Sequence, residues 1–271
     1  MQTEIITIYC LCVEYLASLG HQDDGQVTLT TAEVMTVALV AARFFKGCLE
    51  SSRQFLAEHG YMRQMLSKSR FNRRLHAIPE GLWLGLFAVL AESAKRLSPT
   101  QEYIVDSLPV PVCDNIRIAR CHLYRDEAFR GYIASKRRYF YGVRLHVIVT
   151  AQGYPVEFTL APGAVTDLTA FKMLPLDLPE SATVYADRAY TEYPLEDAWA
   201  AANRQLVVQR RKNSHRPHPP WLTYLCTHIR KQVETTFSTI AELMPKCIRA
   251  VTPRGFELKV GLFLLAFAIC G

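Results

Sequence analysis

The chain has 271 residues, half of them hydrophobic, and a formal net charge of +6. This length and composition exclude a disordered chain and allow one large or two ordinary domains with a hydrophobic core. Lys and Arg gather in four stretches, at residues 68–74, 117–144, 204–216 and 246–259. That distribution favours a nucleic-acid partner.

The eight cysteines show no C-x-x-C motif and no paired spacing, and the N-terminus lacks the basic start of a signal peptide. We therefore expect reduced thiols in a cytoplasmic protein. The apolar run at residues 260–270 is far shorter than the ~20 residues that a membrane-spanning helix needs. It predicts a core helix, and no membrane partner is expected.

Residues 1–97 are predicted to be all-helical. Thr30 and Glu33 form a capping-box pattern at the start of an apolar helix. Short helices follow between residues 51 and 78, and the last of them is basic. This order is typical of a helix-turn-helix unit that lies in a DNA groove. The alternative is a helical subdomain with one solvated basic face.

From residue 101 onward the pattern changes to strands. Residues 103–109 predict a short buried strand that ends at Asp106, and residues 182–187 predict another that ends at Asp187. Between them, residues 140–150 and 155–160 predict a hairpin. Buried carboxylates are costly unless they are paired or bound to a metal, so two at strand ends suggest a shared site.

The remaining elements complete a mixed sheet flanked by helices. In this arrangement the strand with Asp187 can lie beside the strand with Asp106. The further segments are a helix at 167–174, a helix at 193–202, a strand at 205–208, a mobile basic loop at 210–220 and a helix at 222–243.

The last of these helices carries a third acid. An apolar stripe at helical spacing runs along it, and Glu234 sits beside this stripe. In the preceding loop, His215 and His218 are expected to be a solvated pair rather than metal ligands. The loop itself suits a DNA backbone.

Four sequence motifs carry a family resemblance. They read Val-Asp-Ser-Leu-Pro-Val-Pro-Val-Cys, Tyr-Gly-Val-Arg-Leu-His, Tyr-Ala-Asp-Arg-Ala-Tyr and Arg-Lys-Gln-Val-Glu-Thr-Thr-Phe-Ser. With Asp106, Asp187 and Glu234 in the order strand, strand, helix, the chain resembles bacterial insertion-sequence transposases of the DDE type. The resemblance runs from about residue 103 to residue 270, and more loosely over the N-terminal helices.

The resemblance implies an α+β fold: a ribonuclease H-like, five-stranded mixed sheet flanked by helices, preceded by an all-helical domain. The expected domains are residues 1–97, which bind DNA, and residues 98–271, the catalytic domain without a large insertion. Asp106, Asp187 and Glu234 are the expected catalytic residues and ligands of Mg²⁺, with Mn²⁺ as a substitute. The expected partners are the element's terminal inverted repeats, target DNA and a second copy of the chain. The resemblance also implies that the protein acts at the nucleoid in the bacterial cytoplasm.

Candidate DNA contacts are the cations of the basic helix, those of the loop, and those beside Asp187 and Glu234, for which a structural ion pair is the alternative. They are Lys68, Arg70, Arg73, Arg74, Arg188, Arg210, Arg211, Lys212, Arg230 and Lys231. Arg230 fits the Arg that many members place one turn before the Glu. Thr227 and Ala241 stand where those members have Tyr and Lys, and this departure weakens the phosphate contacts assigned to the helix.

Other polar residues have simpler interpretations. Asp114, Asp126, Asp167 and Asp177 are expected to be turn or cap residues, and His146 a hydrogen-bonded core histidine. Two functional alternatives stay open. One is a metal-dependent nuclease of the same fold that does not join strands, and the other is a catalytically silent DNA-binding protein derived from a transposase.

Overall fold

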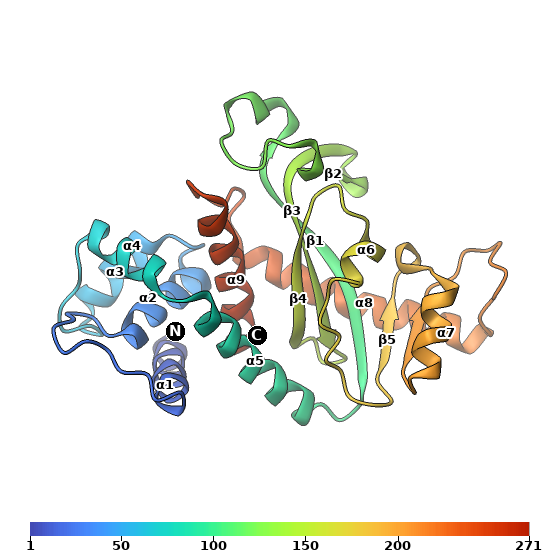
Figure 1. Ribbon diagram of the computed structural model, residues 1–271, viewed down its shortest axis with the longest axis horizontal. Coiled ribbons are helices and arrows are strands. Elements are labelled where there is room, and N and C mark those ends of the chain that lie inside the picture. The colour runs from blue at the N-terminus through green and yellow to red at the C-terminus, as the bar shows by residue number, and fades with distance from the viewer. Residues whose placement is uncertain (271) are drawn as a thin grey trace. The chain divides into compact units, whose positions relative to one another are not determined.

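The computed structural model describes residues 1–270, apart from the side chains of Ser135, Arg230 and Gln232. The chain forms two compact units (Figure 1). One comprises Met1–Leu90 together with Glu242–Gly271, and the other comprises Ala91–Ala241. The second unit holds the sheet and all three predicted acids.

The first unit is helical, as the sequence predicts. Its central helix, α2 (Thr31–Phe44), is buried over nearly its whole length because other helices pack around it. These neighbours are α1 (Gln2–Ser18), α3 (Leu49–Glu58), α4 (Lys68–Ala77) and α9 (Pro253–Cys270). Helix α5 (Glu80–Leu97) begins in this unit and ends in the second one.

Helix α9 confirms the core helix predicted at residues 260–270, since its residues from Leu262 to Phe267 are buried. It packs on α2 and belongs to the first unit. The sequence-based boundary after residue 97 assigns this segment to the other domain. The physical reason for the difference is that α9 is apolar on most sides and therefore needs a partner that is equally buried.

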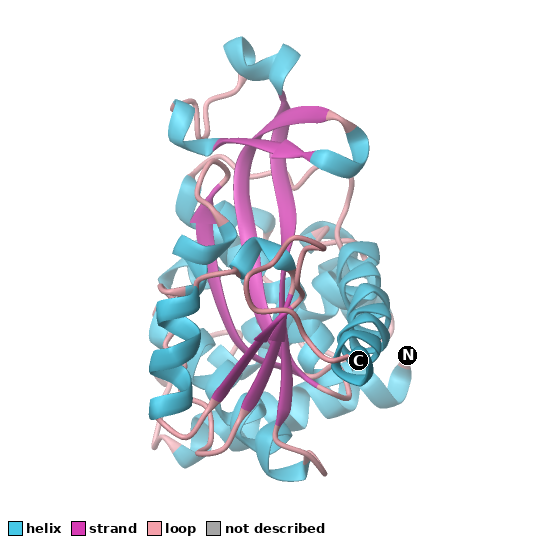
Figure 2. Ribbon diagram, turned by 90° about the vertical axis from the view of Figure 1, so that its right-hand side faces the viewer, coloured by secondary structure: helices cyan, strands magenta, loops and turns pink. Residues whose placement is uncertain are grey.

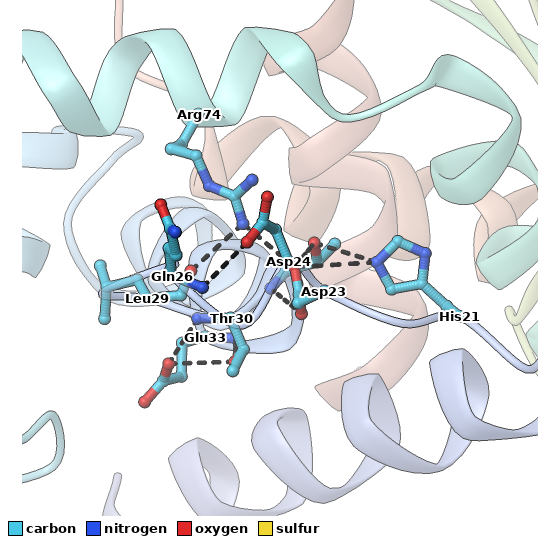
Figure 3. Close-up of polar contacts among 9 residues, drawn as sticks. His21, Asp23, Asp24, Gln26, Leu29, Thr30, Glu33 and Arg74 are labelled. Carbon is cyan, nitrogen blue, oxygen red and sulfur yellow. Dashed lines mark hydrogen bonds and ion pairs between the residues drawn. The ribbon is translucent and has the colours of Figure 1, made fainter.

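The loop before α2 is fixed by side-chain hydrogen bonds (Figure 3). The predicted capping box is present: Glu33 N–H donates to Thr30 Oγ1 at 3.2 Å, and Thr30 N–H donates to Glu33 Oε2 at 2.7 Å. Asp23 accepts from the Thr31 hydroxyl at 2.7 Å and from Arg74 Nη2 at 3.1 Å. Partial burial raises the pKa of Asp23, but the bonds from Thr31 and Arg74 outweigh it and lower that pKa overall.

The second unit is built on a six-stranded mixed sheet. Within it the core order is β4-β3-β1-β5-β6, with β1, β3 and β4 antiparallel and with β5 and β6 parallel to β1. This order confirms the ribonuclease H-like mixed sheet. The strands are β1 (Glu102–Asp114), β2 (Arg130–Ile133), β3 (Arg138–Thr150), β4 (Pro155–Pro162), β5 (Thr183–Ala186) and β6 (Gln205–Val208).

The sheet differs from the expectation in two respects. Strand β2 is an additional sixth strand, and it pairs with β3 on the edge that β4 occupies further along. Strand β1 extends well past Asp106 and includes Pro109 and Pro111. The pairing of β1 with β5 stops at Ile104, so both prolines stand where β1 is paired on one side only, and a strand tolerates Pro there.

Three further helices confirm the predicted segments. They are α6 (Asp167–Phe171), α7 (Tyr193–Ala201) and α8 (Pro220–Leu243). Figure 1 draws α6 in front of the sheet and α8 behind it. The apolar stripe of α8 is buried, as its spacing predicts, at Ile229, Val233, Phe237 and Ile240.

Candidate active site

Strand pairing brings the first two acids together. Ile104 of β1 pairs with Tyr185 of β5, and the two strands are parallel. Asp106 lies in β1 two residues beyond Ile104, and Asp187 lies two residues beyond Tyr185, directly after the last residue of β5. Both aspartates therefore follow the last paired residues of two adjacent strands, and neighbouring strands lie ~4.8 Å apart.

Both aspartates line one pocket of about 370 Å³ of empty space, part of it open to solvent. Strands β1 and β5 supply one wall, α8 supplies an apolar wall, and Gln209 lies just beyond β6. The lining residues are Ile104, Val105, Asp106, Tyr185, Ala186, Asp187, Gln209, Cys226, Ile229 and Val233. The two aspartates are thus the charged residues of a lining that is otherwise mostly apolar.

Backbone N–H groups orient both carboxylates. Asp106 Oδ1 accepts from Ser107 N–H at 2.7 Å, and Asp187 Oδ1 accepts from Ala189 N–H at 2.7 Å. The second bond makes Asp187 the N-cap of the 3₁₀ turn Arg188–Tyr190. Both side chains are half-buried. They are held in place yet stay accessible from the pocket.

The third acid, Glu234, is on helix α8 but outside the pocket lining. Val233 of α8 lines the pocket, whereas the next residue, Glu234, is exposed and is not part of the lining. Among the described side chains, no group of three or more His, Cys, Asp or Glu is close enough to hold a metal ion. The structure therefore brings two of the three predicted acids together, with Glu234 one helical position away from the pocket wall.

Tyr190 was not predicted from the sequence to take part in the site. Its side chain is 1% exposed, and its hydroxyl has no hydrogen-bond partner within the described part of the chain. Burial and the charges of Asp167, Asp106 and Asp187 raise the pKa of Tyr190 well above its usual value. A buried phenol is thus close to three carboxylates. The sequence signal for Tyr190 is its place at the end of the Tyr-Ala-Asp-Arg-Ala-Tyr motif, three residues after Asp187.

Asp167 is more than the turn residue that was expected. It begins α6, accepts a 2.9 Å hydrogen bond from the Ser107 hydroxyl, and lies 3.9 Å from Arg144 Nη1. Successive side chains of a strand point to opposite faces, so Ser107 faces α6 while Asp106 faces α8. Asp167 therefore fixes the residue that follows Asp106.

His146 of β3 is completely buried, which confirms a core histidine. The expected hydrogen bond is absent: neither ring nitrogen has a partner in the described structure, and Asp167 Oδ1 is 3.9 Å from Nδ1. Burial lowers the pKa of His146 to about 4, because Arg144 adds to the effect and Asp167 only partly opposes it. The imidazole is neutral at pH 7.

The predicted DNA contacts fall into three groups. Two are held in ion pairs: Arg74 with Asp23, and Arg210 with Glu196, where Arg210 Nη1 is 2.7 Å from Glu196 Oε1. The side chain of Arg230 lies outside the described residues. The others are exposed, namely Lys68, Arg70, Arg73, Arg188, Arg211, Lys212 and Lys231.

The two loop histidines differ from each other. His215 is exposed, as expected. His218 is not simply solvated, because its Nε2 is 2.8 Å from the carbonyl oxygen of Val208 at the end of β6. This contact ties the loop to the sheet.

No helix among residues 1–270 is by itself both long and apolar enough to cross a bilayer. Helices α4 and α5 reach that length and composition only as a pair, and the pair is bent by 69°.

Comparison with known proteins identifies the second unit. Residues 97–245, more than half of the chain, match the family model described as a transposase DDE domain. No curated protein is similar enough in sequence to count as a match. Among solved structures, the cryo-EM structure of the piggyBac transposase synaptic complex with hairpin DNA is similar, with 13% identity and a TM-score of 0.47. The match covers 97% of this chain and 72% of that one.

Proposed function

Because the chain belongs to the family of transposases with a DDE domain, we propose that it is a bacterial insertion-sequence transposase. In this proposal it binds the ends of the element, hydrolyses a phosphodiester there, and joins the freed 3′ hydroxyl to target DNA. The observation that carries the proposal is the pairing of Ile104 with Tyr185, which puts Asp106 and Asp187 side by side in one pocket.

The donor set fits Mg²⁺, and Mn²⁺ as its substitute. Mg²⁺ prefers oxygen ligands and is commonly bound through one or two carboxylates, with water and substrate phosphate oxygens completing its shell. Asp106 and Asp187 offer two half-buried carboxylates that line the same pocket. When bound in pairs, such ions stabilise the attacking and the leaving oxygen of an in-line displacement.

In the proposed site, backbone groups of the chain hold the carboxylates that would bind the metal. The N–H groups of Ser107 and Ala189 keep the two aspartates in place before DNA arrives. Glu234 is exposed beside the pocket wall, and we expect its side chain to turn toward the aspartates when DNA and metal bind. The same site then serves hydrolysis, with water as nucleophile, and joining, with the 3′ hydroxyl as nucleophile.

DNA recognition is assigned to the first unit and to exposed cations near the site. Lys68, Arg70 and Arg73 are exposed on α4, which is the predicted second helix of a helix-turn-helix unit. Arg188 and Lys231 are exposed next to Asp187 and near Glu234. We further propose that two copies assemble on DNA, since both element ends must be cut together, and that the protein acts at the nucleoid of a bacterial cytoplasm.

The test is strand cleavage and joining on a labelled duplex that carries the element's own end, with Mg²⁺ or Mn²⁺. The intact protein is compared with Glu234→Gln, which keeps the size of the side chain and removes its charge. Joined product from the intact protein alone supports a transposase. Nicks without joining favour the nuclease, and binding without any cut strand leaves a DNA-binding protein.

A further inference from the structure

A second basic surface lies between β1 and β3 and is separate from every DNA contact predicted from the sequence. We call residues 115–139 the basic arm. It contains seven Lys or Arg and two Asp or Glu, a formal net charge of +5 compared with +6 for the whole chain. Figures 1 and 2 show it beyond the ends of the two longest strands, β1 and β3.

The basic arm is anchored to the sheet. Strand β2 pairs with β3 from Arg130↔Tyr141 to Ile133↔Arg138. Leu123 and Tyr124 are buried, and the rings of Tyr124 and Phe129 lie 4.5 Å apart. The cations of the arm are thus presented on a fixed framework.

Close packing holds the base of the arm against β3. A Cβ atom added to Gly131 would come within 2.6 Å of the Phe140 ring and of the Gly163 carbonyl oxygen, so only glycine fits there. Phe140 itself is fully buried. A substitution that moved β2 would therefore be seen as a loss of stability.

Part of the positive charge is neutralised within the arm or at its base. Arg138 lies 3.3 Å from Asp114, and Arg130 lies 3.4 Å from Glu127. Of the other five cations, Arg125 bonds to the carbonyl oxygen of Cys121, and the remaining four are exposed and contact no carboxylate among the described side chains. They are Arg117, Arg120, Lys136 and Arg137.

The chemistry that complements unpaired cations on a fixed surface is a regularly charged polyanion. Double-stranded DNA carries one negative charge per ~1.7 Å of axis, and neutralised phosphates release counterions. We propose that the basic arm binds the phosphate backbone of duplex DNA. This inference rests on the proposed function, and it assigns four specific side chains to phosphate contacts outside the cleavage site.

The length of β1 sets where these contacts fall. From Asp106 to Asp114 the strand covers about 26 Å, at ~3.3 Å per residue. Duplex DNA rises ~3.4 Å per base pair. A duplex that lay along β1 would therefore meet the arm about eight base pairs from a phosphate bound near Asp106.

The test measures binding of a 40-base-pair duplex of arbitrary sequence, without metal, as a function of salt. Two variants remove arm cations in pairs, R117Q/R120Q and K136Q/R137Q. The matched control, R96Q/K172Q, removes two exposed cations of the same unit that are paired with Glu92 and Glu192. Unfolding midpoints of all variants confirm that each is folded.

For each arm variant we expect the slope of log Kd against log salt to fall by about 0.9 for every phosphate that the arm no longer neutralises, and affinity near 0.1 M salt to fall about tenfold or more. The control should bind as the intact protein does. Arm variants that bind like the control would overturn the proposal, as would an intact protein that does not bind the duplex. A larger loss on double-stranded RNA than on DNA would assign the arm to RNA instead.

Cleavage by the intact protein with Mg²⁺ is measured separately and distinguishes the two proposals. If the arm variants bind duplex DNA as tightly as the intact protein does, and the intact protein cuts strands, the proposal for the arm is rejected and the transposase proposal stands. If the arm variants show a lower salt slope and the intact protein cuts no strand, the transposase proposal is rejected and the arm remains a DNA-binding surface.

Discussion

The hydroxyl of Ser107 donates a 2.9 Å hydrogen bond to Asp167, which ties β1 to α6 directly beside Asp106. Arg144 Nη1 lies 3.5 Å from the same hydroxyl and 3.9 Å from Asp167. The face of the sheet opposite the pocket therefore carries a small polar network. Its integrity decides how firmly the middle of β1 is held.

Replacing Asp167 should weaken the fold. In Asp167→Ala the Ser107 hydroxyl loses its acceptor and Arg144 loses a nearby opposite charge while both stay partly buried, which costs about 1–3 kcal/mol. Ser107→Ala leaves Asp167 facing Arg144 and should cost about 1 kcal/mol. Urea unfolding measures both. Equal stabilities for Asp167→Ala and the intact protein would contradict the importance of the network.

The two aspartates of the pocket should trade stability against activity. Asp106 and Asp187 are like charges that line one pocket, so Asp106→Asn removes a repulsion and is expected to keep or raise the melting temperature without metal. Metal-dependent cleavage should fall by at least about a hundredfold, since loss of residues that merely orient a metal ligand costs 10–100-fold. A Glu180→Gln variant, which neutralises an exposed acid of the same unit, serves as the control. A lower melting temperature with full cleavage would be the opposite result.

Acid should destabilise the protein through His146. Burial lowers the pKa of His146 to about 4, whereas the unfolded side chain titrates near 6.5, so the unfolded state binds more protons between these values. The contribution of the neutral His146 to the free energy of unfolding is therefore fully present above pH 6.5. It decreases by about 3 kcal/mol as the pH falls toward 4. Unfolding by urea at pH 7 and pH 5 measures the change.

The control for this prediction is His146→Leu, which cannot titrate. Its stability should change less between pH 7 and pH 5 than that of the intact protein. Asp167 and Arg144 are the charged groups that face the imidazole, and the variant retains both. An identical pH dependence would show that other groups cause the acid sensitivity.

Arg210 and Arg211 are neighbours with different expected roles. Arg210 and Glu196 are only 10% and 9% exposed, and Arg210 also lies over the Tyr193 ring at 5.2 Å. Arg210→Ala leaves a buried carboxylate without its partner and should cost about 3–5 kcal/mol. Arg211→Ala, at an exposed position, should leave stability unchanged and weaken DNA binding. Thermal unfolding and salt-dependent binding separate the two outcomes.

The sequence predicts those parts of the fold that follow from local patterns. The spacing of the apolar residues places α8 and its buried stripe, and the Thr30 and Glu33 pair places the start of α2. The sequence pattern links Asp106 with Asp187 because each follows an apolar strand segment. The parallel pairing of β1 with β5 brings the two aspartates into one pocket. This pairing joins distant segments, so the local pattern suggests it but does not determine it.

What the sequence missed depends on contacts between distant segments. Asp167 reads as a helix-start residue, and only the packing of α6 on β1 reveals its bond to Ser107. Arg210 reads as a loop cation, and its burial against Glu196 depends on how α7 packs. Strand β2 has four residues in a basic stretch, too short for a periodic signal.

The proposal that Asp106 and Asp187 bind a catalytic metal is tested most directly by single-turnover cleavage with Asp187→Cys in Mg²⁺ and in Mn²⁺. A thiolate suits Mg²⁺ poorly and accepts a softer metal better. We expect no cleavage in Mg²⁺ and partial recovery in Mn²⁺, with a greater relative gain than for the intact protein. Cleavage in Mg²⁺ at the rate of the intact protein would contradict a metal-binding role for Asp187.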